Sequence, residues 1–278
     1  MDDELILSIK RRVWKAQRNY SENIKAIEAI LENERGFVSR VNAKDNVVAL
    51  CSGGLDSTVM IAYAIGALGA TVHPLFIRRG ARAEKFEEAA FDFFMDFFKQ
   101  KYGDKLGHVQ KMDLAIPPKE FKGEFKREMV NTVGHPMRNS TLQNMAVNYA
   151  MALEGKYGIE VRTIFSGSVF DDNTEPELGL LSLRAQTLNT CIQTGDWKWQ
   201  ITSPFTDPGI YTNQNGLKAM SKADLIRYAK ETGIPLEKTR TCFSSDEEAD
   251  GSCLACVKRL KAFEEAGVKD QIKYRGGK

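Results

Sequence analysis

The sequence predicts an α/β protein built on a doubly wound, mainly parallel β-sheet. Short apolar runs that are typical of buried strands alternate along the chain with longer segments whose apolar residues recur at helical spacing. A glycine-rich turn joins the first of these strands to the helical segment that follows it. Because strands that alternate with helices are joined by crossover connections, they form a parallel sheet with helices on both faces.

The predicted strands and helices follow one another in regular order. The strands cover residues 46–51, 71–77, 108–112, 162–166 and 200–202. The helices expected between them cover residues 57–68, 84–99, 139–157 and 178–193. In the second of these helices we expect one stripe to pack into the core, formed by Phe86, Ala90, Phe93, Phe94 and Phe97.

Residues 1–45 precede the first strand and form a predicted helical extension. Apolar residues recur at helical spacing in two stretches, which predicts two helices within residues 4–43, the second with Ser21 as a candidate N-cap. We expect these helices to cover the core that follows; a surface for a partner or for a homodimer is the alternative. The chain is thus divided into this extension, a main domain at residues 46–235, and a C-terminal lobe at residues 236–278 that belongs to the same unit.

Composition places the chain among ordinary globular proteins. Of its 278 residues, 42% are hydrophobic and 27% are charged, and the formal net charge is +2. A charge this small, without a basic stripe or a stacking aromatic array, argues against nucleic acid as a partner. No apolar run approaches the roughly 20 residues of a membrane span, and the acidic start differs from a secretory signal, so we expect a cytoplasmic protein without a membrane partner. The five cysteines then favour reduced thiols or metal ligands over disulfides.

The glycine-rich turn after the first strand predicts a phosphate site. It consists of Ser52, Gly53, Gly54, Leu55, Asp56 and Ser57. Backbone N–H groups in a turn that opens a helix bind anions, and both glycines permit positive φ angles and close approach of a polyanion. The hydroxyls of Ser52 and Ser57 can donate to phosphate oxygens, and Asp56 can orient the loop or bind Mg²⁺.

A Walker-type phosphate loop is absent from the sequence. The pattern Gly-x-x-x-x-Gly-Lys-Ser/Thr does not occur, so the chain lacks the lysine that such NTPases place on the β- and γ-phosphates. Cleavage of ATP between the α- and β-phosphates is therefore the expected reaction.

Residues 52–57 resemble the loop of the PP-loop ATP pyrophosphatases, which have the adenine nucleotide alpha hydrolase-like fold. The resemblance implies that the loop holds pyrophosphate as the leaving group while a substrate oxygen attacks the α-phosphorus and becomes adenylated. Such catalysis depends on positioning and on neutralising charge, so no nucleophilic triad is expected.

Further segments within residues 46–263 resemble the 7-cyano-7-deazaguanine synthase (QueC) family. Residues 79–84 are similar to the family's Gly-Gln-Arg-His segment and retain Arg82, which the resemblance assigns to ATP binding. Residues 136–139 are similar to Pro-Gly-Arg-Asn at a helix start, where Arg138 and Asn139 are expected to bind the substrate.

Two more segments extend the resemblance. Residues 220–224 are similar to the family's Thr-Lys-Ala-Glu; Ser221 and Asp224 are spaced as a capping box, and Lys222 is expected to face a phosphate. Residues 171–177 stand where the family has an aspartate followed by Ser-Gly-Tyr-Pro-Asp-Cys, a segment associated with its deazapurine substrate. Asp172 is retained there and is expected to bind substrate, but the serine, tyrosine and cysteine are not retained.

The C-terminal lobe carries a predicted zinc site. Cys242, Cys253 and Cys256 have the spacing Cys-x₁₀-Cys-x₂-Cys, which favours Zn²⁺ in a cytosolic protein. The QueC family has a fourth cysteine where this chain has Asp250. A carboxylate oxygen also ligates zinc, so we expect either a site with Asp250 as the fourth ligand or a three-cysteine site with an open position.

The resemblance implies an ATP·Mg²⁺-dependent C–N ligase of queuosine biosynthesis. It would adenylate a carboxylate such as that of 7-carboxy-7-deazaguanine, and ammonia would then give an amide and, after a second adenylation, the nitrile. The residues expected to act in catalysis are Asp56, Ser57, Arg138 and Lys222. The alternatives are a QueC-like antiphage enzyme that joins the deazaguanine to a protein amine, a tRNA-modifying PP-loop enzyme, and a non-catalytic nucleotide sensor.

Overall fold

The computed structural model describes residues 20–125, 135, 137–174, 176–211 and 218–275. These residues contain a five-stranded sheet in the order β3-β2-β1-β4-β5. The strands are β1 (Asn46–Leu50), β2 (Thr71–Arg78), β3 (Gln110–Asp113), β4 (Thr163–Phe165) and β5 (Gln200–Thr202). Neighbouring strands are parallel, which confirms the predicted sheet.

Strand β1 lies at the centre of the sheet, where the strand order reverses. Val47 is in register with Val72 of β2 on one side and with Thr163 of β4 on the other. The chain adds β2 and β3 on the first side, then crosses over to add β4 and β5. In open α/β sheets, ligands bind beyond the carboxyl ends of the strands at such a reversal, so this edge is where a site is expected.

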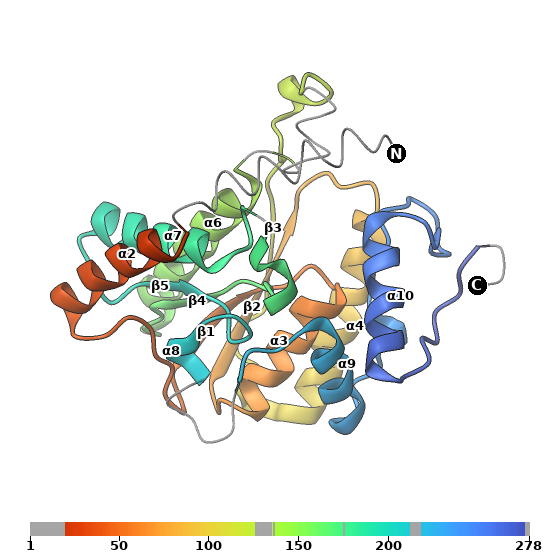
Figure 1. Cartoon of the computed structure of the whole chain (residues 1–278), viewed down its shortest axis with the longest axis horizontal. Helices are drawn as coiled ribbons and strands as arrows, with labels where there is room; N and C mark the ends of the chain where they lie inside the picture. The colour runs from red at the N-terminus through yellow and green to blue at the C-terminus, as the bar shows by residue number, and fades with distance from the viewer. Residues whose placement is uncertain (1–19, 126–134, 136, 175, 212–217, 276–278) are drawn as a thin grey trace.

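Helices cover both faces of the sheet (Figure 1). They are α2 (Tyr20–Arg35), α3 (Leu55–Gly66), α4 (Glu84–Tyr102), α6 (Arg138–Tyr157), α7 (Leu180–Thr194), α8 (Pro208–Tyr211), α9 (Lys222–Glu231) and α10 (Leu254–Ala266). Short 3₁₀ turns are η1 (Gly103–Lys105), η2 (Lys119–Phe121), η3 (Phe170–Thr174) and η4 (Leu236–Lys238). One core cluster joins the sheet to α3, α4 and α9, and another joins it to α2, α6 and α7.

The alternation of β1 shows why both faces are covered. Val47 and Ala49 pack into the first cluster, whereas Val48 packs into the second, and all three are fully buried. Side chains of a strand point alternately to the two faces, so a strand buried on both sides reads as one continuous apolar run.

The predicted stripe on α4 was partly wrong. The buried phenylalanines are Phe91, Phe94 and Phe98, whereas Phe93 is 39% exposed. Phenylalanine lies on two adjacent faces of this helix. The spacing 91, 94, 98 is as compatible with a core-facing helical stripe as the predicted spacing is, and it is the one that packs into the core. Phe93 instead stacks on Phe97 and lies under the Lys238 ammonium, at the edge of the C-terminal segment.

The second predicted N-terminal helix is confirmed, but its candidate N-cap is not, because Ser21 lies within α2 (Tyr20–Arg35). Helix α2 packs against α7, and its Leu31 is fully buried in the core. The first predicted helix falls in residues 1–19, which lie outside the described residues. Of the helices that the structure describes, none has the length and apolarity to cross a membrane.

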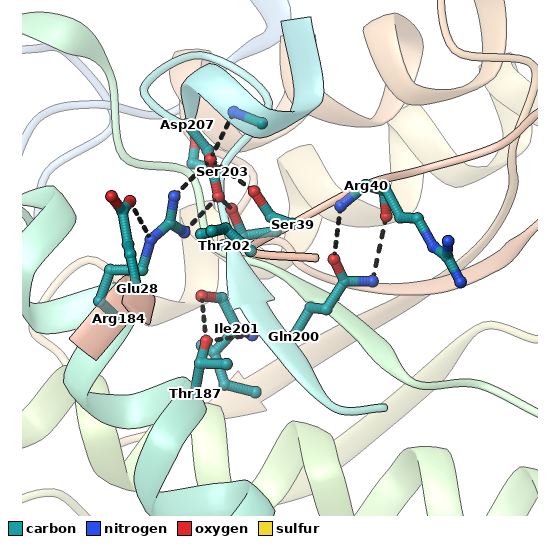
Figure 2. Close-up of polar contacts among 12 residues, drawn as sticks. Glu28, Ser39, Arg40, Arg184, Thr187, Gln200, Ile201, Thr202, Ser203 and Asp207 are labelled. Atoms are coloured by element: carbon teal, nitrogen blue, oxygen red, sulfur yellow. Dashed lines mark hydrogen bonds and ion pairs between the residues drawn. The ribbon is translucent and has the colours of Figure 1, made fainter. Parts of the chain in front are cut away.

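A buried polar network fixes α7 and α2 to the chain that follows β5 (Figure 2). The Arg184 guanidinium donates to both oxygens of Asp207, at 2.6 and 2.7 Å, and to Glu28 on α2 at 2.8 Å. The hydroxyls of Ser39 and Thr202 also donate to Asp207. The carboxylate and the guanidinium are thus paired and hydrogen-bonded, which is the condition for burying charge without a large penalty.

Candidate active site

The loop between β1 and α3 turns sharply at Gly53. Its φ of +70° lies in the left-handed region, and a Cβ on this residue would lie 2.3 Å from the Glu87 carbonyl oxygen and 2.9 Å from the Phe91 nitrogen. Both the angle and the space therefore require glycine. Gly54 has φ −76° as the N-cap of α3, so of the two glycines that permit a positive φ only Gly53 adopts one. An N-cap residue has extended geometry, which explains the difference.

The two serines of the loop lie together at the start of α3. The Ser57 hydroxyl accepts from the Ser52 N–H at 3.2 Å, lies 3.4 Å from the Ser52 hydroxyl, and donates to the Gly54 carbonyl at 3.3 Å. The chain after β4 approaches this pair closely, because a Cβ on Gly167 would lie 3.3 Å from Ser57. The loops that follow β1 and β4 are therefore adjacent at the reversal of strand order.

A pocket of about 210 Å³ opens beside this loop. Its polar wall includes Ser52, Asp56, Ser57, Arg79, Asn139 and Ser166. Its apolar wall includes Leu50, Leu75, Ile77, Leu142 and Leu178. A helix N-terminus and hydroxyls on one side, with aliphatic side chains on the other, suit a ligand that combines an anion with a flat apolar ring.

Asp56, which belongs to the glycine-rich loop at residues 52–57 (hereafter the phosphate loop), forms an ion pair with Lys222. Lys222 Nζ lies 2.9 Å from Asp56 Oδ2, and the lysine side chain is only 13% exposed. Burial alone would lower the pKa of Lys222, but the charge and hydrogen bond of Asp56, together with Asp172 and Asp171, outweigh burial and raise that pKa. Lys222 is therefore a fixed cation at neutral pH.

The second oxygen of Asp56 is available to a ligand. Asp56 Oδ1 is buried and accepts no hydrogen bond from any residue that the structure describes. A carboxylate oxygen is a preferred ligand of Mg²⁺, so the donor set fits a magnesium ion bound together with a polyphosphate.

The N-terminus of α9 carries the predicted capping box. The Ser221 hydroxyl accepts from the Asp224 N–H, and the Asp224 carboxylate accepts from the Ser221 N–H, which confirms the spacing argument. The Lys222 N–H donates to Asp171 Oδ2 at 2.9 Å. These contacts set the direction of the first turn, and with it that of the Lys222 side chain.

Asp172 lies in η3 and is not among the described residues that line the pocket. It is 8% exposed, accepts from the Val169 N–H at 3.3 Å, and lies 3.7 Å from the Lys258 ammonium of α10. Its predicted contact with substrate stays a prediction; its observed neighbours are cations of α9 and α10.

The two predicted residues at the start of α6 lie in different surroundings. Asn139 lines the pocket, and the Arg138 Nε donates to the Asn139 side-chain oxygen at 3.2 Å. Pro136 of the same motif lies outside the described residues.

Burial raises the pKa of Glu177, although Arg138 and the backbone N–H groups of residues 137–139 oppose this rise. Glu177 thus faces the N-terminus of α6, a neighbour that the sequence analysis did not assign.

Arg79, rather than Arg82, lies on the pocket wall. Arg82 is exposed at the start of α4 and is not among the described residues that line the pocket, so its contact with ATP stays a prediction. Arg79 lines the pocket and pairs with Glu87 at 2.9 Å. Sequence reasoning missed it, although Arg79 directly follows β2 and continues the alternation of Leu75 and Ile77, which also line the pocket.

The cysteines of the C-terminal segment converge as the spacing predicts. Ligand atoms of Cys242, Asp250, Cys253 and Cys256 all lie within 4.8 Å of one another. The sulfurs of Cys242 and Cys253 are 4.0 Å apart, close to the roughly 3.8 Å that two thiolates have on a tetrahedral zinc ion. Cys51 and Cys191 are buried and do not belong to this cluster.

Backbone groups surround this cluster. Cys242 Sγ accepts from the N–H groups of Ser244 and Asp250, at 3.4 and 3.3 Å. Asp250 Oδ1 accepts from the N–H groups of Ser252 and Cys253, both at 2.8 Å, and these bonds lower the pKa of Asp250 to about 2. The three thiols and the ionised carboxylate fit a zinc ion, and Asp250 also stabilises the start of α10.

The family model for the queuosine biosynthesis protein QueC matches residues 46–267. The chain belongs to the QueC family. The match runs from β1 to the end of α10, so the QueC region includes the phosphate loop, the pocket and the cysteine cluster.

Relatives agree with the QueC assignment over most of their length. The 7-cyano-7-deazaguanine synthase of Chloroherpeton thalassium is 31% identical over 239 residues, which are 82% of this chain and 96% of the relative. The enzyme of the same name from Acetivibrio thermocellus is 32% identical over 237 residues, with the same shares. Among solved structures, a 4-thiouridine synthetase–RNA complex with bound ATP aligns with 79% of this chain and 53% of its own, at a TM-score of 0.43 and 13% identity.

Proposed function

We propose that this QueC-family protein adenylates the carboxylate of a 7-deazapurine, such as 7-carboxy-7-deazaguanine, and transfers the acyl group to a nitrogen nucleophile. The observation that carries the proposal is the phosphate loop at the reversal of strand order, with the Asp56–Lys222 pair beside it. The relatives named 7-cyano-7-deazaguanine synthase support the choice of substrate and product.

In the first step, a carboxylate oxygen attacks the α-phosphorus of ATP. The bond from the α-phosphorus to the oxygen that bridges to the β-phosphorus breaks, and pyrophosphate leaves with the electron pair. The loop N–H groups and the hydroxyls of Ser52 and Ser57 would bind the departing pyrophosphate, and Lys222 would offset its growing charge. Mg²⁺ held by Asp56 would supply further neutralisation of the polyphosphate.

In the second step, the nucleophile attacks the acyl carbon and AMP leaves. Ammonia gives an amide after losing a proton. A second ATP then adenylates the amide oxygen with release of pyrophosphate and one N–H proton, and loss of AMP and the second N–H proton gives the nitrile. The aliphatic wall of the pocket suits a flat heterocycle, and Arg138, Asn139 and Asp172 are our candidates for contacts with the substrate's polar groups.

Zinc has a structural role in this proposal. Cys242, Cys253 and Cys256, with Asp250 as fourth ligand or near neighbour, would hold it. A bound ion would join the segment that carries Cys242 to the start of α10 and add to the folding free energy of that segment.

The test is incubation of the protein with ATP·Mg²⁺, 7-carboxy-7-deazaguanine and ammonium, followed by mass spectrometry of small molecules and of the protein. We expect AMP, pyrophosphate and the nitrile, all dependent on the carboxylate. An increase in protein mass by the deazaguanine acyl group would instead support the protein-amine alternative. ADP and phosphate as products, or ATP binding without turnover, would contradict the proposal.

A further inference from the structure

Arg240 contacts both the phosphate loop and the segment that carries Cys242, and it has no assigned role in the ATP site or the zinc site. It follows η4 and precedes Cys242 by two residues. Its backbone N–H donates to the Gly53 carbonyl at 2.8 Å, so the C-terminal segment bonds directly to the phosphate loop. Its own carbonyl oxygen is near the next loop residue, since a Cβ on Gly54 would lie 3.4 Å from it.

The Arg240 side chain organises the segment that carries Cys242. Its guanidinium donates to four backbone carbonyls, those of Cys242 at 3.2 Å, Ser244 at 2.6 Å, Asp246 at 2.6 Å and Glu247 at 2.7 Å. A planar guanidinium has five donors in a fixed fork, so it can hold several carbonyls of one turn at once. The same guanidinium lies 4.7 Å from the centre of the Phe86 ring, at the start of α4.

The bond to Gly53 bears on the geometry of the phosphate loop. A peptide unit is planar and trans, so its C=O and N–H point in opposite directions. The Arg240 N–H fixes the Gly53 carbonyl and thereby directs the Gly54 N–H away from the C-terminal segment. Gly54 lines the pocket, whereas the Gly53 Cα is held against Glu87 and Phe91. Any movement of residue 240 therefore changes the orientation of an N–H group that the anion site uses.

We propose that Arg240 is a positioning residue that couples the zinc site to the phosphate loop. Zinc orders the Cys242 segment, the guanidinium transmits this order to the Arg240 main chain, and the Arg240 N–H fixes the Gly53–Gly54 peptide for phosphate binding. Because coupling between two sites is reciprocal, zinc strengthens ATP binding and ATP strengthens zinc binding by the same factor. The inference rests on the ATP and zinc sites of the proposed function, and not on which carboxylate is activated.

The experiment measures ATP·Mg²⁺ affinity by calorimetry with zinc-loaded and zinc-depleted protein, and the equilibrium release of zinc to a competing chelator with and without ATP. In the wild type we expect zinc to tighten ATP binding by about tenfold, and ATP to reduce zinc release to the chelator by a corresponding factor. In Arg240→Ala both effects should fall below about twofold. Arg240→Lys keeps the charge but not the planar fork, so its coupling should lie between the two.

Arg227→Ala is the matched control. Arg227 also donates to a backbone carbonyl of the C-terminal segment, that of Glu265 at 2.5 Å, and pairs with Asp224 at 2.9 Å, and neither partner belongs to the loop at residues 52–57. It should keep the wild-type coupling. If zinc-depleted protein unfolds, the effect of ATP on zinc release from the loaded wild type decides the question.

The proposal is overturned if ATP affinity in the wild type does not depend on zinc, if ATP leaves zinc release unchanged, or if the protein takes up no zinc. It is also overturned if Arg240→Ala lowers thermal stability but keeps the wild-type ratio of affinities, since that result describes a purely structural arginine. None of these readouts needs the deazapurine, so failure of the proposed reaction would be recognised separately.

Discussion

Gly53 is the residue of the phosphate loop whose identity is most tightly constrained. Gly53→Ala would combine a left-handed φ, which costs about 1–2 kcal/mol, with a Cβ placed 2.3 Å from a backbone oxygen. We expect it to lower the free energy of unfolding by more than about 3 kcal/mol and to abolish ATP binding, because the loop must shift. Urea unfolding and calorimetry with ATP measure both effects.

Two other glycines provide controls for that prediction. Gly195 has φ +67° and open space around its Cα, so Gly195→Ala should pay only the conformational cost of about 1–2 kcal/mol and keep ATP binding. Gly54 has φ −76°, and a Cβ there would meet the movable Ser52 hydroxyl at 3.2 Å, so Gly54→Ala should fold. Equal stability of Gly53→Ala and Gly195→Ala would refute the packing argument.

Asp56 and Lys222 are the residues expected to act on the polyphosphate. Removing one preorganised charged or donor group typically costs about 10²–10³-fold in turnover. We expect Asp56→Ala, Lys222→Ala and Arg138→Ala each to reduce carboxylate-dependent pyrophosphate release by that order, and Ser57→Ala to do the same through the loop. Lys261→Ala, an exposed lysine of α10, should leave the rate unchanged. Near wild-type turnover in Asp56→Ala would remove the loop from the mechanism.

Among the elements, the junction of α2, α7 and β5 depends on the Arg184–Asp207 pair (Figure 2). Burial alone would raise the pKa of Asp207, but the hydrogen bonds and charge of Arg184 outweigh it and lower that pKa below 3.8. The ionised carboxylate therefore stabilises the fold at any pH above 3.8, and this contribution is lost as the pH falls through the native pKa.

The corresponding prediction concerns Asp207→Asn. It removes the buried counter-ion of the Arg184 guanidinium and leaves, among the described residues, only Glu28, at 2.8 Å, so the free energy of unfolding at neutral pH should fall by about 3 kcal/mol. The gap between wild type and variant should shrink below pH 3.8, where the carboxyl of the unfolded chain becomes protonated, and should close as the pH falls through the lower pKa of native Asp207. Urea unfolding across this range measures the gap, with Glu160→Gln at an exposed ion pair as the control that changes little. A gap that stays constant with pH would show that the Asp207 charge is not what stabilises the junction.

The sequence predicts the positions of strands and helices better than it predicts which face of a helix packs into the core. Strands and helices were predicted with ends close to those observed, because apolar runs and helical spacing report burial directly. The core face of α4 was predicted only in part, with Ala90 and Phe94 buried as expected, because phenylalanine occupies two faces of the helix and only the packing of neighbouring elements selects between them.

The site was predictable to the extent that it is local in sequence. Residues 52–57 and the Ser221–Asp224 box are contiguous, and their roles as a turn and a cap follow from short-range geometry. Arg79 and Arg240 depend on contacts between segments far apart in the chain, namely the pocket wall and the Gly53 carbonyl. No spacing rule reports such contacts.

For the molecule as a whole, we expect about one zinc ion per chain, held by Cys242, Cys253 and Cys256. Its removal should loosen the C-terminal segment, because metal binding supplies folding free energy there. Asp250→Cys restores the fourth thiolate of the family pattern. If the zinc site is structural, this variant should retain zinc longer in the presence of a chelator than the wild type does. Impaired turnover of the variant would instead indicate that zinc has an open position that serves the substrate.

Elemental analysis and thermal unfolding measure this prediction. Cys253→Ser and Cys256→Ser should lose zinc and melt at lower temperature than the wild type. Wild-type protein without zinc, together with unchanged stability in both serine variants, would make these cysteines packing residues only.

The central claim is that a substrate carboxylate, and not water, attacks the α-phosphorus of ATP. The most direct measurement uses 7-carboxy-7-deazaguanine labelled with ¹⁸O in its carboxylate, with mass spectrometry of the AMP that is formed. Because the attacking oxygen stays on phosphorus when the acyl–oxygen bond breaks, each AMP should carry one ¹⁸O atom. Unlabelled AMP, or ADP in its place, would contradict adenylation of the carboxylate.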